Sequence, residues 1–324
     1  MIEAIEAKSY PSKGGRIHNS YISGRKILNH IEYPETIEPP KELIKFYSVT
    51  QNSVNALTKG FLWATNPLTF NDPFDCPIQL WNIDSFTMKK LQPILDPQNH
   101  FMLKEDDVLH NRSIFSELRF ATLGIICLHE FSLKNQDILW GYYTNQEGFA
   151  IKFDSHQLIK SWGVPFKVDY LKKSKLDHFN LNILESPPDV FPLFLRWSTQ
   201  KKRVWKNENE WRFIFSNLEA DTLTIDAPKE ERSKKYNSSD IEEVILGLKF
   251  FHQTNMVEES INRSYYIIDG ELHKLQNEIL TFISFPSEIP VKHMYMKAGE
   301  LELTPRACVI SKEMNGRFRI DYLE

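Results

Sequence analysis

Short apolar runs separated by turn residues make up most of the chain beyond residue 42, and most of these runs have the length of a strand. They are rich in β-branched and aromatic residues, which favour strands, and they are bounded by Gly, Pro, Asn or Asp. The predicted strands are Leu43–Val49, Phe61–Thr65, Thr122–His129, Gly148–Asp154, Val164–Leu171, Trp211–Phe215, Thr222–Ile225 and Glu243–Leu246.

Stretches with the apolar spacing of helices are mixed with these runs in no regular order. Thr50 or Asn52 is suited to cap a first helix, which Gly60 ends. The predicted helices cover residues 53–59, 84–95, 105–119, 136–143, 191–200, 255–264 and 272–283. A hairpin is predicted over Ala307–Leu323, with its turn at Asn315-Gly316. Because strands and helices do not alternate steadily, we expect an α+β fold rather than a doubly wound sheet.

The first forty residues differ from the rest of the chain. They contain Gly14-Gly15, scattered basic residues and a closing Pro39-Pro40, with no sustained apolar period. We therefore expect an N-terminal extension over residues 1–40 and a single α+β domain of catalytic type over residues 41–324.

Composition narrows the class of protein. Among 324 residues there are only 12 glycines, and their spacing forms neither G-x-G-x-x-G nor G-x-x-x-x-G-K-[ST], so the two commonest phosphate-binding loops are absent. The three cysteines form no C-x-x-C pair, the net charge is −4, and no apolar run approaches the length that spans a bilayer. We expect a soluble cytoplasmic protein with no signal peptide and no membrane partner.

The segment from Trp205 to Arg212 is the first candidate for chemistry. Glu208 and Glu210 are two residues apart, so on an extended segment they point to one face, with Trp205, Trp211 and Arg212 beside them. Paired carboxylates repel, which raises one pKa and provides an acid or a base, and a carboxylate also stabilises an oxocarbenium-like sugar. The alternative is a solvated strand edge with ordinary Glu–Arg pairs.

The loop that contains Phe70-Asn71-Asp72-Pro73-Phe74-Asp75 is the second candidate. It is either a ligand-facing loop, in which Asn71 and Asp72 supply polar contacts, or a structural loop. In the structural alternative Phe70 and Phe74 fill the core while the Asn and Asp side chains bond their own backbone. Asp72 and Asp75 also offer oxygen ligands for a hard cation.

Two further stretches carry candidate residues. Trp140 and Tyr143 share a face of a predicted helix, either as a ligand platform or as core residues. The cations Lys201-Lys202-Arg203 and Lys206 precede the acidic pair; they either hold phosphates of a nucleotide or nucleic acid, or lie at a solvated helix end.

Taken together, these stretches resemble a bacterial protein family of unknown function that is characterised by FNDPFD and W-x-x-E-x-E-W-R motifs. The resemblance covers roughly residues 43–250. Tyr142 departs from it, since it stands where the family often has His, and Gln146 lies near the position of another such His. The matching segments are Lys45–Tyr47, Gly60–Asp75, Ile138–Phe153, Trp205–Arg212 and Ile241–Gly247.

The segment Phe46–Thr65 also resembles the first half of a domain of the ADP-ribosyltransferase superfamily. That resemblance implies a split, mixed or antiparallel sheet with flanking helices, and NAD as the substrate that donates ADP-ribose. By position, Tyr47 would meet the nicotinamide end, Thr65 would bond the ribose and Glu210 would stabilise the oxocarbenium, with Glu208 acting on the acceptor.

The same resemblance implies a macromolecular acceptor, protein or nucleic acid, and a toxin or phage-defence role with a controlling antitoxin or regulatory protein. It assigns Glu210, Glu208 and Tyr47 to catalysis, an aromatic such as Phe74 to packing on the nicotinamide, and no residue to a metal. The candidate residues for holding NAD are Thr65, Phe70, Asn71, Asp72, Phe74, Trp140, Tyr143 and Arg212.

Two other function classes stay open from the residues alone. A metal-dependent nuclease would gather Mg²⁺ with Asp72, Asp75, Glu208 and Glu210, and the Lys cluster would hold the nucleic-acid backbone. A non-catalytic sensor or partner-binding module would use the same aromatic and acidic residues as a recognition groove.

Overall fold

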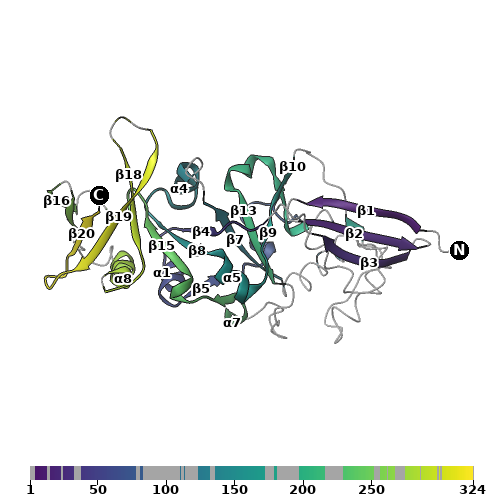
Figure 1. Ribbon diagram of the computed structural model, residues 1–324, viewed down its shortest axis with the longest axis horizontal. Coiled ribbons are helices and arrows are strands. Elements are labelled where there is room, and N and C mark those ends of the chain that lie inside the picture. The colour runs from purple at the N-terminus through teal and green to yellow at the C-terminus, as the bar shows by residue number, and fades with distance from the viewer. Residues whose placement is uncertain are drawn as a thin grey trace. The chain divides into compact units, whose positions relative to one another are not determined.

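The computed structural model (Figure 1) divides into two compact units, which we describe one at a time. Unit 1 holds Met1–Pro39, Trp63–Cys127 and Val164–Lys234, and unit 2 holds Pro40–Leu62, Leu128–Gly163 and Lys235–Glu324. The structure describes residues 4–12, 15–22 and 25–32 (backbone only), 38–77, 81–82, 110, 113, 123–131, 136–171, 179–180, 197–215, 229–251, 256–260, 262–266, 274–284, 286–297, 299 and 301–323.

A large sheet dominates unit 2. The strand order is β16-β17-β20-β19-β18-β15-β8-β4, and the second half of β7 (Gly124–Glu130) lies beside β4. Neighbouring strands are antiparallel except β15 and β18, which are parallel. The strands are β4 (Glu42–Tyr47), β8 (Phe149–Asp154), β15 (Ile241–Leu246), β16 (Met256–Ser260), β17 (Arg263–Tyr266), β18 (Val291–Met296), β19 (Leu303–Lys312) and β20 (Phe318–Tyr322).

Few helices accompany this sheet in unit 2. They are α1 (Gln51–Thr58), α4 (Gln136–Thr144), α5 (Ser155–Trp162), α8 (Lys274–Ile283) and the short 3-10 helix η6 (Ser238–Asp240). The predicted α+β class with a mixed, mostly antiparallel sheet is therefore confirmed. Across the described part of the chain, no helix has both the length and the apolar character needed to cross a bilayer.

Local sequence signals explain the start of unit 2. Thr50 caps α1 through a reciprocal capping box with Ser53, which satisfies two backbone donors at the helix start. Gly148 then allows β8 to pair closely with β4, because a Cβ at this position would lie 2.0 Å from the carbonyl oxygen of Tyr47. Neighbouring residues are buried in both strands, and in β8 the buried run is unbroken from its first to its fifth residue. Because successive side chains of a strand point to opposite faces, the sheet is packed on both faces here.

His293 on β18 is a buried titratable group in unit 2. Its Nδ1 lies 2.9 Å from the hydroxyl of Tyr322, and burial lowers the pKa of His293 to about 4. An unfolded chain binds a proton at this side chain near pH 6.5, so between pH 6.5 and 4 the unfolded state holds more protons than the folded state. Stability therefore falls as the pH is lowered through this window.

We expect that acidification from pH 7 to pH 4 removes about 3 kcal/mol of unfolding free energy through His293 alone. Urea denaturation at several pH values measures this change. His293→Gln should flatten the pH dependence between pH 6.5 and 4.5, and an unchanged slope in that variant would contradict the assignment.

Strands make up most of the regular structure in the described part of unit 1. β1 (Ala4–Ser12), β2 (Gly15–Ile22) and β3 (Arg25–Glu32) form an antiparallel sheet within the segment predicted as an extension. β13 (Glu210–Phe215) pairs with β9 (Phe166–Lys167), and β10 (Asp169–Leu171) runs parallel to β12 (Gln200–Lys202). The other described elements of unit 1 are β6 (Trp81–Asn82), β11 (Phe179–Asn180), α7 (Lys229–Arg232), η1 (Pro67–Thr69) and η5 (Arg203–Glu208). β5 (Phe61–Trp63) and β14 (Ser233–Lys235) each include residues of both units.

Two predicted helices differ from the structure. The helix predicted at 255–264 is wrong, because this segment forms β16 and the start of β17. Tyr266 on β17 packs on Phe251 with ring centroids 5.0 Å apart, and β17 pairs with β20, so tertiary pairing overrides the helical pattern. The helix predicted at 191–200 is wrong at its end, because Gln200 begins β12. The predicted elements at 84–95 and 222–225, and residues 191–196, lie outside the described residues. Of the helix predicted at 105–119, residues 110 and 113 alone are described, and both are helical.

Candidate functional site

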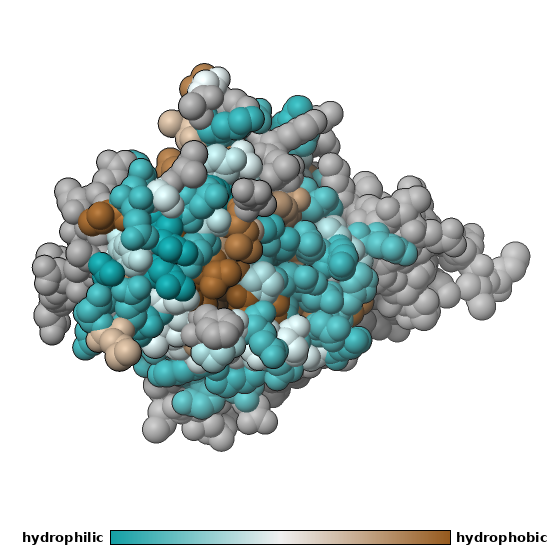
Figure 2. Space-filling view, turned by 60° about the vertical axis from the view of Figure 1, so that its left-hand side comes forward, coloured by the Kyte–Doolittle hydropathy of each residue, from teal (hydrophilic) through white to brown (hydrophobic). Residues whose placement is uncertain are grey.

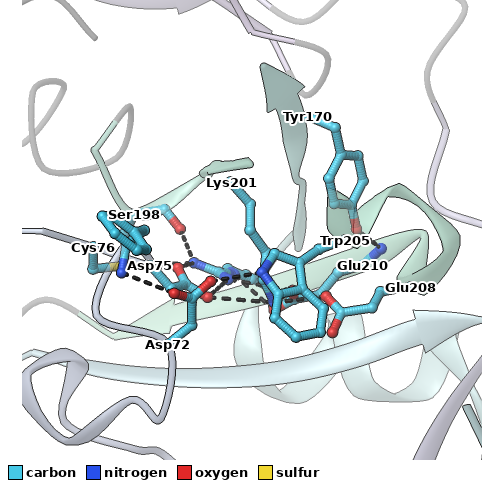
Figure 3. A network of polar contacts seen from close by, with 11 residues as sticks. Asp72, Asp75, Cys76, Tyr170, Ser198, Lys201, Trp205, Glu208 and Glu210 are labelled. Carbon is cyan, nitrogen blue, oxygen red and sulfur yellow. Dashed lines mark hydrogen bonds and ion pairs between the residues drawn. The ribbon is translucent and has the colours of Figure 1, made fainter. Parts of the chain in front are cut away.

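Five buried charged side chains meet at the start of β13 in unit 1 (Figure 3). They comprise three carboxylates and two cations, so the cluster carries one more negative than positive charge. Their exposed fractions lie between 0% and 8%. We call this group the β13 cluster; its members are Asp75, Lys201, Glu208, Glu210 and Arg212.

Arg212 bridges two of the carboxylates. Its Nε donates to Glu210 Oε1 at 2.7 Å, and its two terminal nitrogens donate to the Asp75 oxygens at 2.9 and 2.6 Å. A further bond reaches the carbonyl oxygen of Ser198 at 2.6 Å. Burial alone lowers the pKa of Arg212, but the charges of Asp75 and Glu210 raise it well above its ordinary value. The guanidinium is therefore a permanent positive centre.

Lys201 is the second cation of the cluster, and it contacts all three carboxylates. Its Nζ donates to Glu208 Oε2 at 2.6 Å and to Glu210 Oε2 at 3.0 Å, and lies 3.4 Å from Asp75 Oδ2. Burial lowers the pKa of this ammonium, but Glu210 and Asp75 raise it above its ordinary value. Glu210 thus has Oε1 bound to Arg212 and Oε2 bound to both Lys201 and Arg212, which fixes its carboxylate in place.

The local backbone brings Glu208 and Glu210 to the same ammonium by a turn. Glu208 ends the 3-10 helix η5, and Asn209 then has a left-handed φ of 44° before β13 begins at Glu210. Asn is one of the few residues that tolerate this conformation. The prediction that the pair lies on one extended segment is therefore wrong at Glu208. The alternative of a solvated strand edge is wrong as well, because both carboxylates are buried.

Tyr170 on β10 supports the first residue of β13. The backbone N–H of Glu210 donates to the Tyr170 hydroxyl at 2.8 Å. Burial raises the pKa of Tyr170, and the charge of Glu210 raises it further, so the phenol stays protonated.

The loop from Phe70 to Asp75 connects to η5 through Asp72. One Asp72 oxygen accepts from the backbone N–H of Phe74 at 2.9 Å, and the other accepts from Trp205 Nε1 at 2.6 Å. The Trp205 ring lies 5.4 Å from Lys201 Nζ, and the Phe70 ring lies 5.4 Å from the guanidinium carbon of Arg212. Two aromatic rings therefore pack against the two cations of the β13 cluster.

The other candidate residues of unit 1 lie outside the cluster. Asn71 is exposed, and Phe74 is exposed with the ammonium of Lys202 above its ring. Thr65 is half-buried and exchanges two backbone hydrogen bonds with Ile125, each 2.9 Å long.

The remaining candidate residues lie in unit 2. Tyr47 at the end of β4 stacks on Phe149, with ring centroids 5.3 Å apart, and burial raises the pKa of its phenol. Trp140 and Tyr143 on α4 both contact Phe46: Trp140 edge-on at 5.1 Å and Tyr143 in parallel at 6.3 Å.

Trp140 has an unusual environment for an indole. It is fully buried in the core cluster around Phe46, and its Nε1 has no hydrogen-bond partner within the described part of the chain. A buried N–H without a partner lowers stability, because it gives up its hydrogen bond to water.

We expect Trp140→Phe to change the free energy of unfolding by less than about 1.5 kcal/mol, because it keeps most of the packing and removes the unpaired N–H. Trp140→Ala should lose about 3–5 kcal/mol. Urea denaturation of both variants measures the difference, and equal losses would contradict this prediction.

A cavity that the sequence did not predict lies in unit 2. It has a volume of about 260 Å³, and it includes Cys308, whose pKa is raised to about 12 by burial. The lining residues are mostly apolar and come from the end of α8, residues 287–290, β18, β19 and Leu323. No local pattern could have indicated a cavity built from segments so far apart.

Figure 2 shows a face where hydrophobic residues gather near the middle and hydrophilic residues surround them.

The carboxylates of the β13 cluster form ion pairs with the cations of the same cluster. Asp75, Glu208 and Glu210, three of the residues considered for a magnesium site, each bond Lys201 or Arg212. In the part of the chain that the structure describes, no group of three or more His, Cys, Asp or Glu side chains is arranged to hold a metal ion.

No protein-family model, no curated protein and no solved structure matches this chain. Both family resemblances therefore stay predictions.

Proposed function

We propose that the protein is an ADP-ribosyltransferase-like enzyme that transfers ADP-ribose from NAD to a macromolecule. The observation that carries the proposal is the excess of carboxylate over cation in the β13 cluster, where Glu208 and Glu210 share the ammonium of Lys201. The proposal includes the split sheet typical of that superfamily.

The excess negative charge suits a reaction that develops positive charge. When the bond between ribose and nicotinamide breaks, its electron pair leaves with the nicotinamide and the ribose becomes an oxocarbenium-like cation. A fixed carboxylate in a buried site stabilises that cation strongly, because the local dielectric is low and no reorganisation is needed. Glu210, held by Arg212 and Lys201, is suited to this electrostatic role.

Glu208 is suited to act on the acceptor. Its position at the end of η5 gives it one bond to Lys201, at 2.6 Å. In the proposed reaction Glu208 removes the proton from the acceptor nucleophile as that nucleophile bonds to the ribose carbon. The products are the ADP-ribosylated acceptor, free nicotinamide and one proton. Thr65, which lies in the same unit as Glu208 and Glu210, keeps the role that the resemblance gives it, at the ribose.

For NAD to reach the carboxylates of Glu208 and Glu210, the side chain of Trp205 on η5 must move. Glu208 is 4% exposed and Glu210 is 1% exposed. Trp205 packs against Lys201 and is bound to Asp72. In the proposed enzyme, binding of NAD moves this indole away from Lys201 while its Nε1 stays bound to Asp72.

The proposed setting is the bacterial cytoplasm, as a toxin or phage-defence effector under the control of an antitoxin or regulatory protein. Three free cysteines support a reducing compartment.

The purified protein, incubated with labelled NAD and cell extract, should release nicotinamide and label a macromolecule. Separate protease and nuclease treatments then identify the acceptor as protein or nucleic acid. Thermal stabilisation by NAD without nicotinamide release would overturn the transferase and favour a binding module. Metal-dependent cleavage of nucleic acid without NAD would favour the nuclease.

A further inference from the structure

The four cations that precede the acidic pair divide into two groups. Lys201 points into the β13 cluster, whereas Lys202, Arg203 and Lys206 are exposed. Among the described residues, none of these three exposed cations forms an ion pair. Three positive charges within five positions therefore face solvent on a protein whose overall charge is −4. Such a local concentration of charge attracts anions even when the whole protein is slightly acidic.

Exposed apolar groups lie among these cations. Phe74 is 54% exposed, and the ammonium of Lys202 lies over its ring. Val204, between Arg203 and Trp205 in the sequence, is 75% exposed. We call Phe74, Lys202, Arg203, Val204 and Lys206 the η5 surface.

The η5 surface is held in place by the bond between Trp205 and Asp72. That bond, 2.6 Å long, joins η5 to the loop that carries Phe74, although the two residues are 133 positions apart in the sequence. The aromatic ring and the cations consequently belong to one supported surface rather than to two independent loops.

We propose that the η5 surface binds single-stranded nucleic acid, with Arg203 and Lys206 on phosphates. Lys202 moves from the Phe74 ring to a third phosphate, and one base takes its place on that ring. Cations that follow a backbone beside an aromatic ring are the features that single strands bind. A duplex offers its phosphates but keeps its bases stacked, so it cannot use the ring. An acidic peptide would pair with the cations and leave Phe74 unused.

The position of this surface connects it to the proposed reaction. Glu208 lies two residues after Lys206, at the end of the same 3-10 helix. In the step that rests on the proposed function, a nucleotide held on the η5 surface is the acceptor of ADP-ribose. Phe74 then stacks on the acceptor rather than on nicotinamide.

Binding is measured on the full chain without NAD, by fluorescence anisotropy of a labelled twelve-nucleotide RNA or DNA strand. With three phosphate contacts, we expect the logarithm of the binding constant to fall with the logarithm of salt concentration with a slope of about −2. The triple variant K202Q/R203Q/K206Q should lose at least about tenfold in affinity and most of the salt slope.

Phe74→Ala should weaken single-strand binding by about fivefold or more while it leaves the salt slope unchanged, because stacking carries no charge. K160Q/K249Q/K274Q, which removes three exposed cations of unit 2, is the matched control and should bind like the original protein. Equal affinities of the η5 and control triple variants would overturn the proposal, as would tighter binding of an acidic peptide or of a duplex.

The binding assay tests the η5 surface and the NAD assay tests the transferase, so either proposal can be rejected without the other. Single-strand binding without nicotinamide release would support the η5 surface and reject the transferase. Nicotinamide release without single-strand binding would reject the η5 surface and support the transferase.

Discussion

Arg212→Met is expected to destabilise the protein by about 3–5 kcal/mol, because it leaves buried carboxylates without their partner. Arg212 is fully buried and donates to both Asp75 and Glu210, so the variant removes one of the two cations that balance Asp75, Glu208 and Glu210 in the β13 cluster. Urea denaturation at pH 7 measures the loss as a lower midpoint.

A matched control and a rescue make this prediction specific. Arg263→Met breaks an exposed ion pair with Asp321 and should leave the urea midpoint nearly unchanged. Asp75→Asn combined with Arg212→Met removes one unpaired charge, so the double variant should lose less stability than the two single variants together. If Arg212→Met behaves like Arg263→Met, the β13 cluster does not contribute to stability as described.

Helices and hairpins whose start or turn depends on a few neighbouring residues could be predicted from the sequence. The capping box of Thr50 and Ser53 gives α1 its start, and the Asn315-Gly316 turn, where Gly316 has a φ of 83°, gives the hairpin of β19 and β20. β17 could not be predicted in the same way. Its strand conformation depends on pairing with β20, which lies more than fifty residues further along the chain.

The candidate site is predictable only in part. The sequence indicates that Glu208 and Glu210 act together, and the structure brings both to Lys201. It does not indicate that Lys201 points inward and Lys202 outward, which the pairing of β12 with β10 determines. Nor does it indicate that Asp75 bonds Arg212, since 137 positions separate them.

Glu210→Gln is expected to reduce nicotinamide release by at least about a hundredfold, because it removes the charge that stabilises the oxocarbenium. From the sequence alone, this change should affect turnover and leave folding intact. The structure adds a cost to stability. The amide group of Gln must face Lys201 or Arg212, which bond the two oxygens of Glu210, so we expect a loss of about 1–3 kcal/mol as well.

Glu243→Gln separates these two effects. Glu243 on β15 is also a buried carboxylate with two cationic partners, Lys152 at 2.8 Å and Lys292 at 2.7 Å, and it lies in unit 2. Its replacement should cost similar stability in urea denaturation and leave nicotinamide release unchanged. If Glu210→Gln loses stability to the same extent but keeps its turnover, the β13 cluster is a structural ion network and Glu210 has no part in catalysis. A loss of turnover in Glu210→Gln alone assigns the catalytic charge to Glu210.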